Sequence, residues 1–150
     1  MIALLQRVLE AEVKSAQHAV GSIDLGILLF LGISFDDGMD DISYIVDKVI
    51  NLRIFSGPKG DLDVSVKNIS GSILIISQFT LMASIKNGRR PNFKNAMTSD
   101  NAKNIYEIVV NEFIKTGINV VTGEFKSQMI VKSSNDGPFT IIVNSKDRSV

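Results

Sequence analysis

The feature that most constrains the fold is a series of short apolar runs, rich in β-branched residues and separated by Gly, Pro, Asp and Ser. Residues 71–83, GSILIISQFTLMA, start at a glycine and predict a central strand that is buried on both faces. Residues 2–13, IALLQRVLEAEV, contain good helix formers, but their alternation favours a long strand. Further strands are predicted at 18–24, at 26–34, at both ends of 53–66, and at 118–125, 127–133 and 139–145.

Two segments instead have the three- and four-residue spacing of an amphipathic helix. The first begins within DDGMDD at 36–41, which predicts a turn plus a helix N-terminus with acidic residues in the first turn. The second follows the capping residues of 98–100 and ends before Gly117. Their apolar positions are Ile42, Ile45, Val46, Val49 and Ile50 in the first helix, and Ala102, Ile105, Val109 and Phe113 in the second. With about seven or eight strands, we expect a single α+β domain over residues 1–150, in which two helices pack outside a strongly curved, antiparallel-rich, barrel-like sheet.

Composition excludes several kinds of site. The chain has no cysteine and a single histidine, His18, so we expect no disulfide, no metal and no cofactor. His18 lies in a polar stretch near a predicted turn, which favours a surface or structural role over catalysis. A net charge of zero is not typical of a nucleic-acid-binding domain, so DNA is not expected and any RNA must be held locally. No signal peptide or membrane-spanning run is recognisable, which predicts a cytoplasmic location and no membrane partner.

The first candidate site segment is SQFTL, where polar side chains end the predicted central strand. In an extended chain, Ser77, Phe79 and Leu81 point to one face. Gln78 and Thr80 then point to the other face. Groups at the end of a rigid strand are well placed to contact a ligand. A strand that frays into solvent is an equally good interpretation of these residues alone.

The second candidate segment is a basic loop, KNGRRPNF. It places Lys86, Arg89 and Arg90 between Gly and Pro residues and beside an aromatic ring, which suits a phosphate backbone or the end of an RNA. A solvated loop is the simpler interpretation. A third segment, TGEFKSQMIV, has Phe125 and Met129 next to a glycine turn. These two side chains suit a sandwich around a flat base, although core packing is the commoner role.

The fourth segment is NDGPFT, which lies between two apolar runs and therefore predicts a turn between two strands. Gly137 allows backbone angles that other residues resist, and Pro138 follows it directly. Such a pair can present two carbonyl groups in a fixed direction. Fixed carbonyls can discriminate chirality, because they tolerate a substituent on one side of a carbon and clash with it on the other. Taken alone, the segment is better explained as a plain turn.

Together these segments resemble the D-aminoacyl-tRNA deacylase family, and the resemblance covers the chain nearly end to end. It rests on MIALLQRV, on LGI before the acidic turn, and on LRIF, SQFTL, RRPNF, TGEF and NDGPFT. The joint presence of SQFT and the Gly-Pro motif, in this order and separation, is the most specific part. The resemblance implies a homodimer of small barrel-like subunits, with active sites at the subunit interface. It also implies hydrolysis of the ester that joins a D-amino acid to the terminal ribose of a tRNA.

The resemblance further implies roles for individual residues. Gly137 and Pro138 would form a cis step that enters the partner subunit's active site and rejects L-aminoacyl groups. Arg7 would help to fix the carbonyls of that step. Glycyl-tRNA is a further expected substrate, because glycine has no side chain to reject. Phe125 and Met129 would border the terminal adenine of the tRNA.

Ser77, Gln78, Phe79 and Thr80 would line the pocket for the aminoacyl ester, according to the same resemblance. Thr80 is a candidate nucleophile, but no base stands near it in the sequence. The favoured alternative is that backbone donors near Phe79 and Thr80 hold the carbonyl while the tRNA's own 2′-hydroxyl helps to activate water. The loop with Lys86, Arg89 and Arg90 would bind the tRNA.

One departure from the family pattern is Phe139, where Val is more usual after the proline. A related family has a trans Gly-Pro step and acts on certain L-aminoacyl-tRNAs, but SQFT together with NDGP is typical of the D-specific branch. Two other classes of function remain open. One is a non-catalytic nucleic-acid-binding module that uses the basic loop, and the other is a generic amidase or esterase that uses Thr80.

Overall fold

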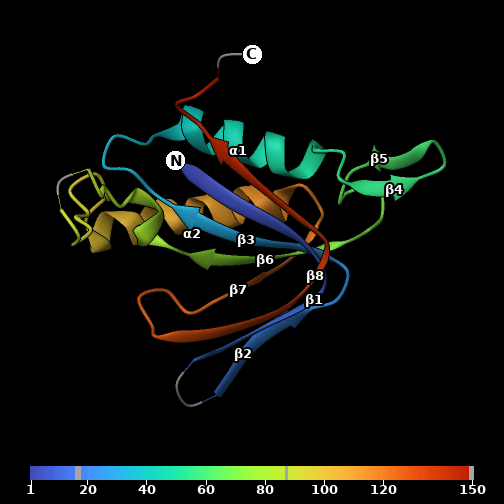
Figure 1. Ribbon diagram of the computed structural model, residues 1–150, viewed down its shortest axis with the longest axis horizontal. Coiled ribbons are helices and arrows are strands. Elements are labelled where there is room, and N and C mark those ends of the chain that lie inside the picture. Colours follow the sequence, from blue (N-terminus) through green and yellow to red (C-terminus); the bar gives the residue numbers. More distant parts are fainter. Residues whose placement is uncertain (16–17, 87, 149–150) are drawn as a thin grey trace.

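The computed structural model describes residues 1–15, 18–86 and 88–148, and its centre is a six-stranded sheet (Figure 1). The strand order is β2-β1-β3-β6-β7, and β8 pairs with β1, while β4 and β5 form a separate hairpin. The strands are β1 (Ile2–Ser15), β2 (His18–Ile23), β3 (Gly26–Gly32), β4 (Phe55–Gly57), β5 (Gly60–Val64), β6 (Ser72–Ser77), β7 (Asn119–Thr122) and β8 (Met129–Asn144). The helices are α1 (Met39–Asn51), α2 (Ser99–Lys115) and the short 3₁₀ helix η1 (Phe79–Met82).

The central strand β6 is buried on both faces, as its uninterrupted apolar run predicts. Successive side chains of a strand point to opposite faces of the sheet. Ile73 and Ile75 accordingly join the core beneath the helices, where Phe113 of α2 is also buried. Leu74 and Ile76 join a second core on the opposite face of the sheet. The candidate segment SQFTL therefore begins at the end of a strand that is packed on both faces.

The sheet curves until its outer strands β2 and β7 meet. Gly21 of β2 lies so close to Val121 of β7 that an added Cβ atom would collide with it. The long strand β1 supports this curvature, because it pairs with β3 through residues 2–8 and with β2 through residues 11–15. These pairs are antiparallel, whereas β6 pairs with β3 and β7 in parallel. The predicted α+β class with a strongly curved, barrel-like sheet is confirmed.

Both helices pack on the same face of the sheet, in one core with β1, β3 and β6 (Figure 1). Helix α1 starts after Gly38, whose amide donates to the Asp41 carboxylate at 3.0 Å. Helix α2 ends before Gly117, which has a φ of 82°, as predicted. Thr98 takes the N-cap position of α2, but its side chain makes no capping hydrogen bond, so the predicted side-chain cap is not formed there. No helix in the described part of the chain is long and apolar enough to cross a bilayer.

The chain leaves the extended conformation earlier than predicted after β6. The last pair between β3 and β6 joins Leu31 to Ser77, and the Gln78 amide then donates to the Leu31 carbonyl at 2.8 Å. Strand β6 pairs with β3 no further, and the backbone closes into η1, where the Ala83 amide donates to the Thr80 carbonyl at 3.1 Å. The predicted alternation of side chains along SQFTL is therefore wrong.

Residues 129–144 form one continuous strand rather than two strands joined by a turn, so that prediction is also wrong. Both ends of β8 pair with β1, with Gln6 opposite Thr140 and Val8 opposite Asn135. Residues 136–139 consequently have only Arg7 opposite them and bulge out of the ladder. The chain does not reverse here because the same neighbouring strand continues past the bulge.

Candidate active site

A cavity of about 610 Å³ opens at the carboxyl ends of the parallel strands β3 and β6. Neighbouring parallel strands stop together, which leaves a crevice where ligands commonly bind. The wall is built from Leu31 and Ile33, from residues within 76–79 and 96–102, and from residues within 125–131. Most of this lining is apolar or neutral, so the cavity suits a largely uncharged ligand.

Ser77, Gln78 and Phe79, three of the four predicted pocket residues, line this cavity, whereas Thr80 does not. The side-chain amide of Gln78 donates a hydrogen bond to the Thr80 hydroxyl. Within the described residues, the backbone amides of Phe79 and Thr80 donate to no other group. Both amides are therefore available to a carbonyl oxygen of a ligand.

The opposite wall carries Phe125 and Met129, the two residues predicted to border a base, and both line the same cavity. Phe125 belongs to a turn in which the Ser127 amide donates to the Glu124 carbonyl at 3.3 Å. Lys126 is the third residue of this turn and also lines the cavity. Sequence patterns did not single out Lys126, although a lysine beside a glycine-bounded aromatic was a signal that could have been used.

Tyr106 of α2 joins the two walls. Its hydroxyl donates to the Ile75 carbonyl at 2.9 Å, and the Gly123 amide donates to the same carbonyl at 3.0 Å. Its ring packs against Phe125, with ring centroids 5.6 Å apart. Burial raises the pKa of Tyr106, which keeps the hydroxyl protonated as a donor. Sequence analysis missed Tyr106, because a tyrosine in a helix pattern resembles any other core residue.

The basic loop folds back beside the cavity. The backbones of Ser84 and Asn92 pair with each other at 2.8 and 3.0 Å, and the Phe93 ring then packs edge-on against Phe79 with centroids 5.0 Å apart. The predicted tRNA-binding residues of this loop are exposed, and in the described part of the chain they pair with no carboxylate: Lys86, Arg89 and Arg90. The cations therefore remain available to an anionic ligand.

The predicted chirality filter does not line the cavity of its own chain. Gly137 and Pro138 are exposed, and the peptide bond between them is cis. Gly137 has a φ of 117°, and a Cβ atom added there would lie 3.2 Å from Nη2 of Arg7. This position therefore favours glycine chiefly for its conformation, and a larger residue would also press on Arg7.

Arg7 supports the bulge from the facing strand. Its Nη1 donates to the Ile54 carbonyl at 2.5 Å, and its Nε pairs with the Asp136 carboxylate at 2.9 Å. The guanidinium also lies over the Phe139 ring, 5.2 Å from its centroid. Arg7 thus holds the residues on both sides of the Gly-Pro step. Its expected contact with the Gly-Pro carbonyls stays a prediction, and Asp136 was not foreseen as its partner.

No Asp, Glu or His side chain lines the cavity in the part of the chain that the structure describes, and the one charged side chain there is that of Lys126. His18 is exposed at the start of β2, where its Nδ1 lies 3.3 Å from Oγ of Ser15. The described residues also contain no group of three or more His, Asp or Glu side chains placed to hold a metal ion. A hydroxyl such as that of Thr80 consequently lacks a partner that would activate it.

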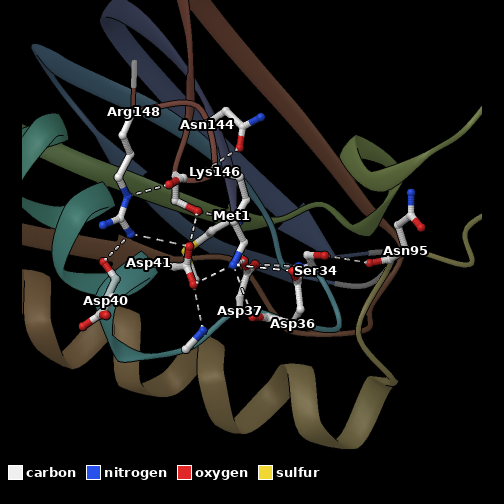
Figure 2. Close-up of polar contacts among 12 residues, drawn as sticks. Met1, Ser34, Asp36, Asp37, Asp40, Asp41, Asn95, Asn144, Lys146 and Arg148 are labelled. Atoms are coloured by element: carbon white, nitrogen blue, oxygen red, sulfur yellow. Dashed lines mark hydrogen bonds and ion pairs between the residues drawn. The ribbon is translucent and has the colours of Figure 1, made fainter. Parts of the chain in front are cut away.

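A second polar region lies where the start of β1, the turn before α1 and the end of β8 meet (Figure 2). We call it the terminal charge cluster, and it comprises Met1, Asp37, Asp41, Ser145 and Lys146. The Met1 ammonium lies 2.5 Å from Oδ1 of Asp37, and both groups are buried. The Ser145 hydroxyl donates to Oδ1 of Asp41 at 2.6 Å, and the Lys146 ammonium pairs with Oδ2 of Asp41 at 3.0 Å.

The carboxylate of Asp41 is kept ionised in this cluster. Burial alone would raise its pKa, but hydrogen bonds from Ser145, from the Gly38 amide and from Lys146 hold the pKa of Asp41 well below its usual range. The same contact with Asp41 raises the pKa of Lys146. The sequence indicated only that these acidic residues suit a helix N-terminus, since Ser145 and Lys146 come from the far end of the chain.

Comparisons with known proteins show the family of the chain. The model of the D-Tyr-tRNA(Tyr) deacylase family matches residues 4–144. The chain is 41% identical to the D-aminoacyl-tRNA deacylase of Thermoanaerobacter sp. (strain X514), over 97% of this chain and 98% of that protein. It is 45% identical to the D-aminoacyl-tRNA deacylase of Clostridium botulinum (strain Alaska E43 / Type E3), over 97% of both chains.

Two solved structures have the same fold. One, described as "c-Myc DNA Unwinding Element Binding Protein", has a TM-score of 0.90 and 34% identity, covering 96% of this chain and 98% of that chain. The other, described as a probable eukaryotic D-amino acid tRNA deacylase, has a TM-score of 0.79 over 95% and 97% of the two chains, and its 16% identity supports the fold alone. Because the family model and the relatives span nearly the whole chain, the protein belongs to the D-Tyr-tRNA(Tyr) deacylase family and is a hydrolase that acts on ester bonds.

Proposed function

We propose that the protein hydrolyses the ester bond of D-aminoacyl-tRNA and releases free tRNA and a D-amino acid, as a chiral proofreading step in translation. The observation that carries this proposal is the convergence of Ser77, Gln78 and Phe79 with Phe125 and Met129 on one cavity. Its volume of about 610 Å³ is typical of pockets that hold small organic groups, here a terminal adenosine with its amino acid. The names of the relatives support the substrate class.

The cavity has a separate wall for each part of this ligand. The adenine lies between Phe125 and Met129, because an aromatic ring and a polarizable thioether both pack well against a flat base. The ester carbonyl would face the free backbone amide of Phe79, which lines the cavity, with the free amide of Thr80 next along the chain. These donors stabilise the negative charge that develops on the carbonyl oxygen in the transition state. The Ser77 hydroxyl, which bonds no other described residue, is left to contact the aminoacyl group.

The attacking group in this proposal is water. Its oxygen bonds to the carbonyl carbon, the bond from that carbon to the ribose oxygen breaks, and the ribose oxygen takes up a proton. No Asp, Glu or His of the described chain lines the cavity to relay this proton, so the neighbouring 2′-hydroxyl of the tRNA takes that part. Thr80, which accepts a hydrogen bond from Gln78, is then a positioning residue and not a nucleophile.

Chirality would be measured by a second copy of the chain. Gly137 and Pro138 are exposed and lie outside the cavity of their own chain, while Arg7 and Asp136 hold the bulge that carries them. This arrangement supports a homodimer in which the bulge of one subunit enters the cavity of the other. Its carbonyls would exclude an L side chain, and glycyl-tRNA would be accepted because glycine has none.

The remaining parts of the tRNA would be held by the basic loop. Lys86, Arg89 and Arg90 are exposed and without a carboxylate partner in the described chain, and the loop is anchored to the cavity by the contact of Phe93 with Phe79. Cations placed in this way suit phosphate groups beyond the terminal nucleotide. The substrate would be met in the cytoplasm, where aminoacyl-tRNAs are used.

The test is hydrolysis of matched D-Tyr-tRNA and L-Tyr-tRNA by the wild type and by Gly137→Ala. We expect the wild type to cleave the D-ester alone, and Gly137→Ala to lose activity or selectivity because φ is 117° and the added Cβ atom would displace Arg7. Gly117→Ala is the matched control, since its φ is also positive but its Cβ atom would meet no neighbour. Equal cleavage of both esters would refute the chirality filter. Tight nucleic-acid binding with a steep salt dependence and no hydrolysis would favour a binding module instead.

The mechanism has its own test. A substrate whose terminal ribose lacks the 2′-hydroxyl should be cleaved about 100-fold more slowly, because the proton relay is removed. Thr80→Val should retain activity within about tenfold. If the deoxy substrate reacts normally and Thr80→Val is inactive, Thr80 is the nucleophile of a generic esterase.

A further inference from the structure

The turn at 124–127 contains a residue that is unusual for its backbone conformation. Lys126 has a φ of 64°, in the left-handed region that disfavours residues with a Cβ atom. Turns that require a positive φ at their third position normally use Gly or Asn. A backbone outlier of this kind is a reason to look for a function of the side chain.

The surroundings of Lys126 point to a ligand. Among the described residues that line the cavity, Lys126 is the only one with a charged side chain. It is exposed and pairs with no carboxylate in the described chain. Other lysines do pair, for example Lys115 with Glu112 at 2.7 Å and Lys14 with Glu12 at 2.6 Å. Lys126 is thus an uncommitted cation at the wall of an otherwise uncharged cavity.

The charges of the substrate indicate what this cation would meet. The adenine and ribose are neutral, and the amino acid carries an ammonium group, which Lys126 would repel. The nearest anionic group of an aminoacyl-tRNA is the phosphate that joins the terminal adenosine to the preceding nucleotide. A lysine ammonium is a common point-charge partner for phosphate.

We propose that Lys126 binds this phosphate and so fixes which end of the cavity takes the adenosine and which takes the amino acid. The inference rests on the deacylase function proposed above. Lys126 follows Phe125, the proposed adenine contact, directly in the chain, so its side chain starts beside the nucleoside. The ester would then lie on the other side of the cavity, near Ser77 and the free amides of η1. The basic loop, whose cations do not line the cavity, would bind phosphates farther along the tRNA.

Two small substrates test this assignment without the rest of the tRNA. One is adenosine carrying D-tyrosine as an ester on its ribose 3′ oxygen, and the other is the same ester with a 5′-phosphate. We expect the phosphate to lower KM about tenfold for the wild type, with little change in kcat. Lys126→Gly and Lys126→Gln should lose this preference, and Lys126→Arg should keep it. Lys103→Gln, which removes an exposed lysine of α2, is the control for net charge.

Folding of the variants provides a second readout. Glycine adopts a positive φ freely, so Lys126→Gly should unfold at the same denaturant midpoint or a higher one. If Lys126→Gly is at least as stable as the wild type but has the same KM with and without the phosphate, the lysine contributes to binding and is not needed to form the turn. Equal KM values for the two esters in the wild type, or an unchanged preference in Lys126→Gly, would overturn the assignment.

Calorimetric binding of adenosine and of adenosine 5′-monophosphate separates this inference from the proposed function. If no D-ester is hydrolysed but the monophosphate binds more tightly through Lys126, the deacylase proposal fails and the phosphate contact stands. If D-esters are hydrolysed and adenosine binds as tightly as its monophosphate, the deacylase proposal stands and the role of Lys126 is refuted.

Discussion

The terminal charge cluster and the cavity differ in whether their polar groups have partners within the chain. In the cluster, each carboxylate meets partners of this same chain, such as Ser145 and Lys146 on Asp41 (Figure 2). In the cavity, the Ser77 hydroxyl, the Phe79 amide and the Lys126 ammonium find no partner in the described residues. A polar group whose partners are internal stabilises the fold, whereas one without an internal partner is available to a ligand.

This difference predicts that substitutions in the cluster lower the free energy of unfolding, whereas substitutions in the cavity lower activity. The largest effect is expected in the cluster. Asp41→Ala should lower the free energy of unfolding by about 3 kcal/mol, because the Ser145 hydroxyl and the Gly38 amide lose their acceptor and Lys146 loses its nearest carboxylate. Denaturant unfolding monitored by circular dichroism measures this change. A loss below about 1 kcal/mol would mean that water replaces these contacts at little cost.

The same carboxylate should shape stability in acid. Its pKa is lowered in the folded protein, so its contribution is fully present above the unfolded pKa of about 4 and is lost as the pH falls toward the folded value. Asp41→Asn keeps the shape but removes the charge, so its stability should change less between pH 5 and pH 2 than that of the wild type. If the free energy of unfolding falls equally with pH in the two proteins, other carboxylates are responsible for the loss of stability in acid.

A smaller effect, on a different measurement, is expected in the cavity. Ser77→Ala should lower kcat/KM for D-Tyr-tRNA about tenfold, the value of one hydrogen bond to the aminoacyl group. Its free energy of unfolding should stay within about 0.5 kcal/mol of the wild type, because the hydroxyl has no internal partner in the described chain. Loss of stability without loss of activity would show that Ser77 has a structural role, and would contradict the distinction between the cluster and the cavity.

The smallest effect tests a residue that belongs to both categories. Tyr106→Phe removes the hydrogen bond to Ile75 but keeps the ring against Phe125. We expect the free energy of unfolding to fall by about 1 kcal/mol, since the Gly123 amide still satisfies the same carbonyl. KM should rise modestly if the hydroxyl also positions the Phe125 wall. An unchanged KM would make Tyr106 purely a core residue.

Local patterns predicted much of the fold correctly. The apolar run at 73–76, the helix starts within 36–41 and 98–100, and the glycine that follows α2 all lie where expected. These features depend on periodicity and on the conformational preferences of neighbouring residues, which act within a few positions along the chain. The four segments judged capable of chemistry also include residues of both cavity walls, since Phe79 and Phe125 line the same space.

Features that depend on distant partners were predicted poorly. SQFTL leaves the extended conformation because β3 ends beside it, and the Gly-Pro step bulges because β1 runs past it with Arg7 alone in register. The partner of Arg7 is Asp136, and no spacing in the sequence indicates that pair. In each case the deciding neighbour is a strand that lies far away along the chain.

By itself the sequence determined the elements, the burial of the central strand on both faces, the family, and the segments from which a site can be made. These follow from local periodicity and from motifs that are specific as short strings. Only the tertiary structure decided which segments meet, that Thr80 and the Gly-Pro step lie outside the cavity of their own chain, and that Lys126 faces it uncommitted. The physical reason is that pairing register and side-chain contacts depend on residues brought together by the curved sheet, so they are properties of the packed chain rather than of any segment.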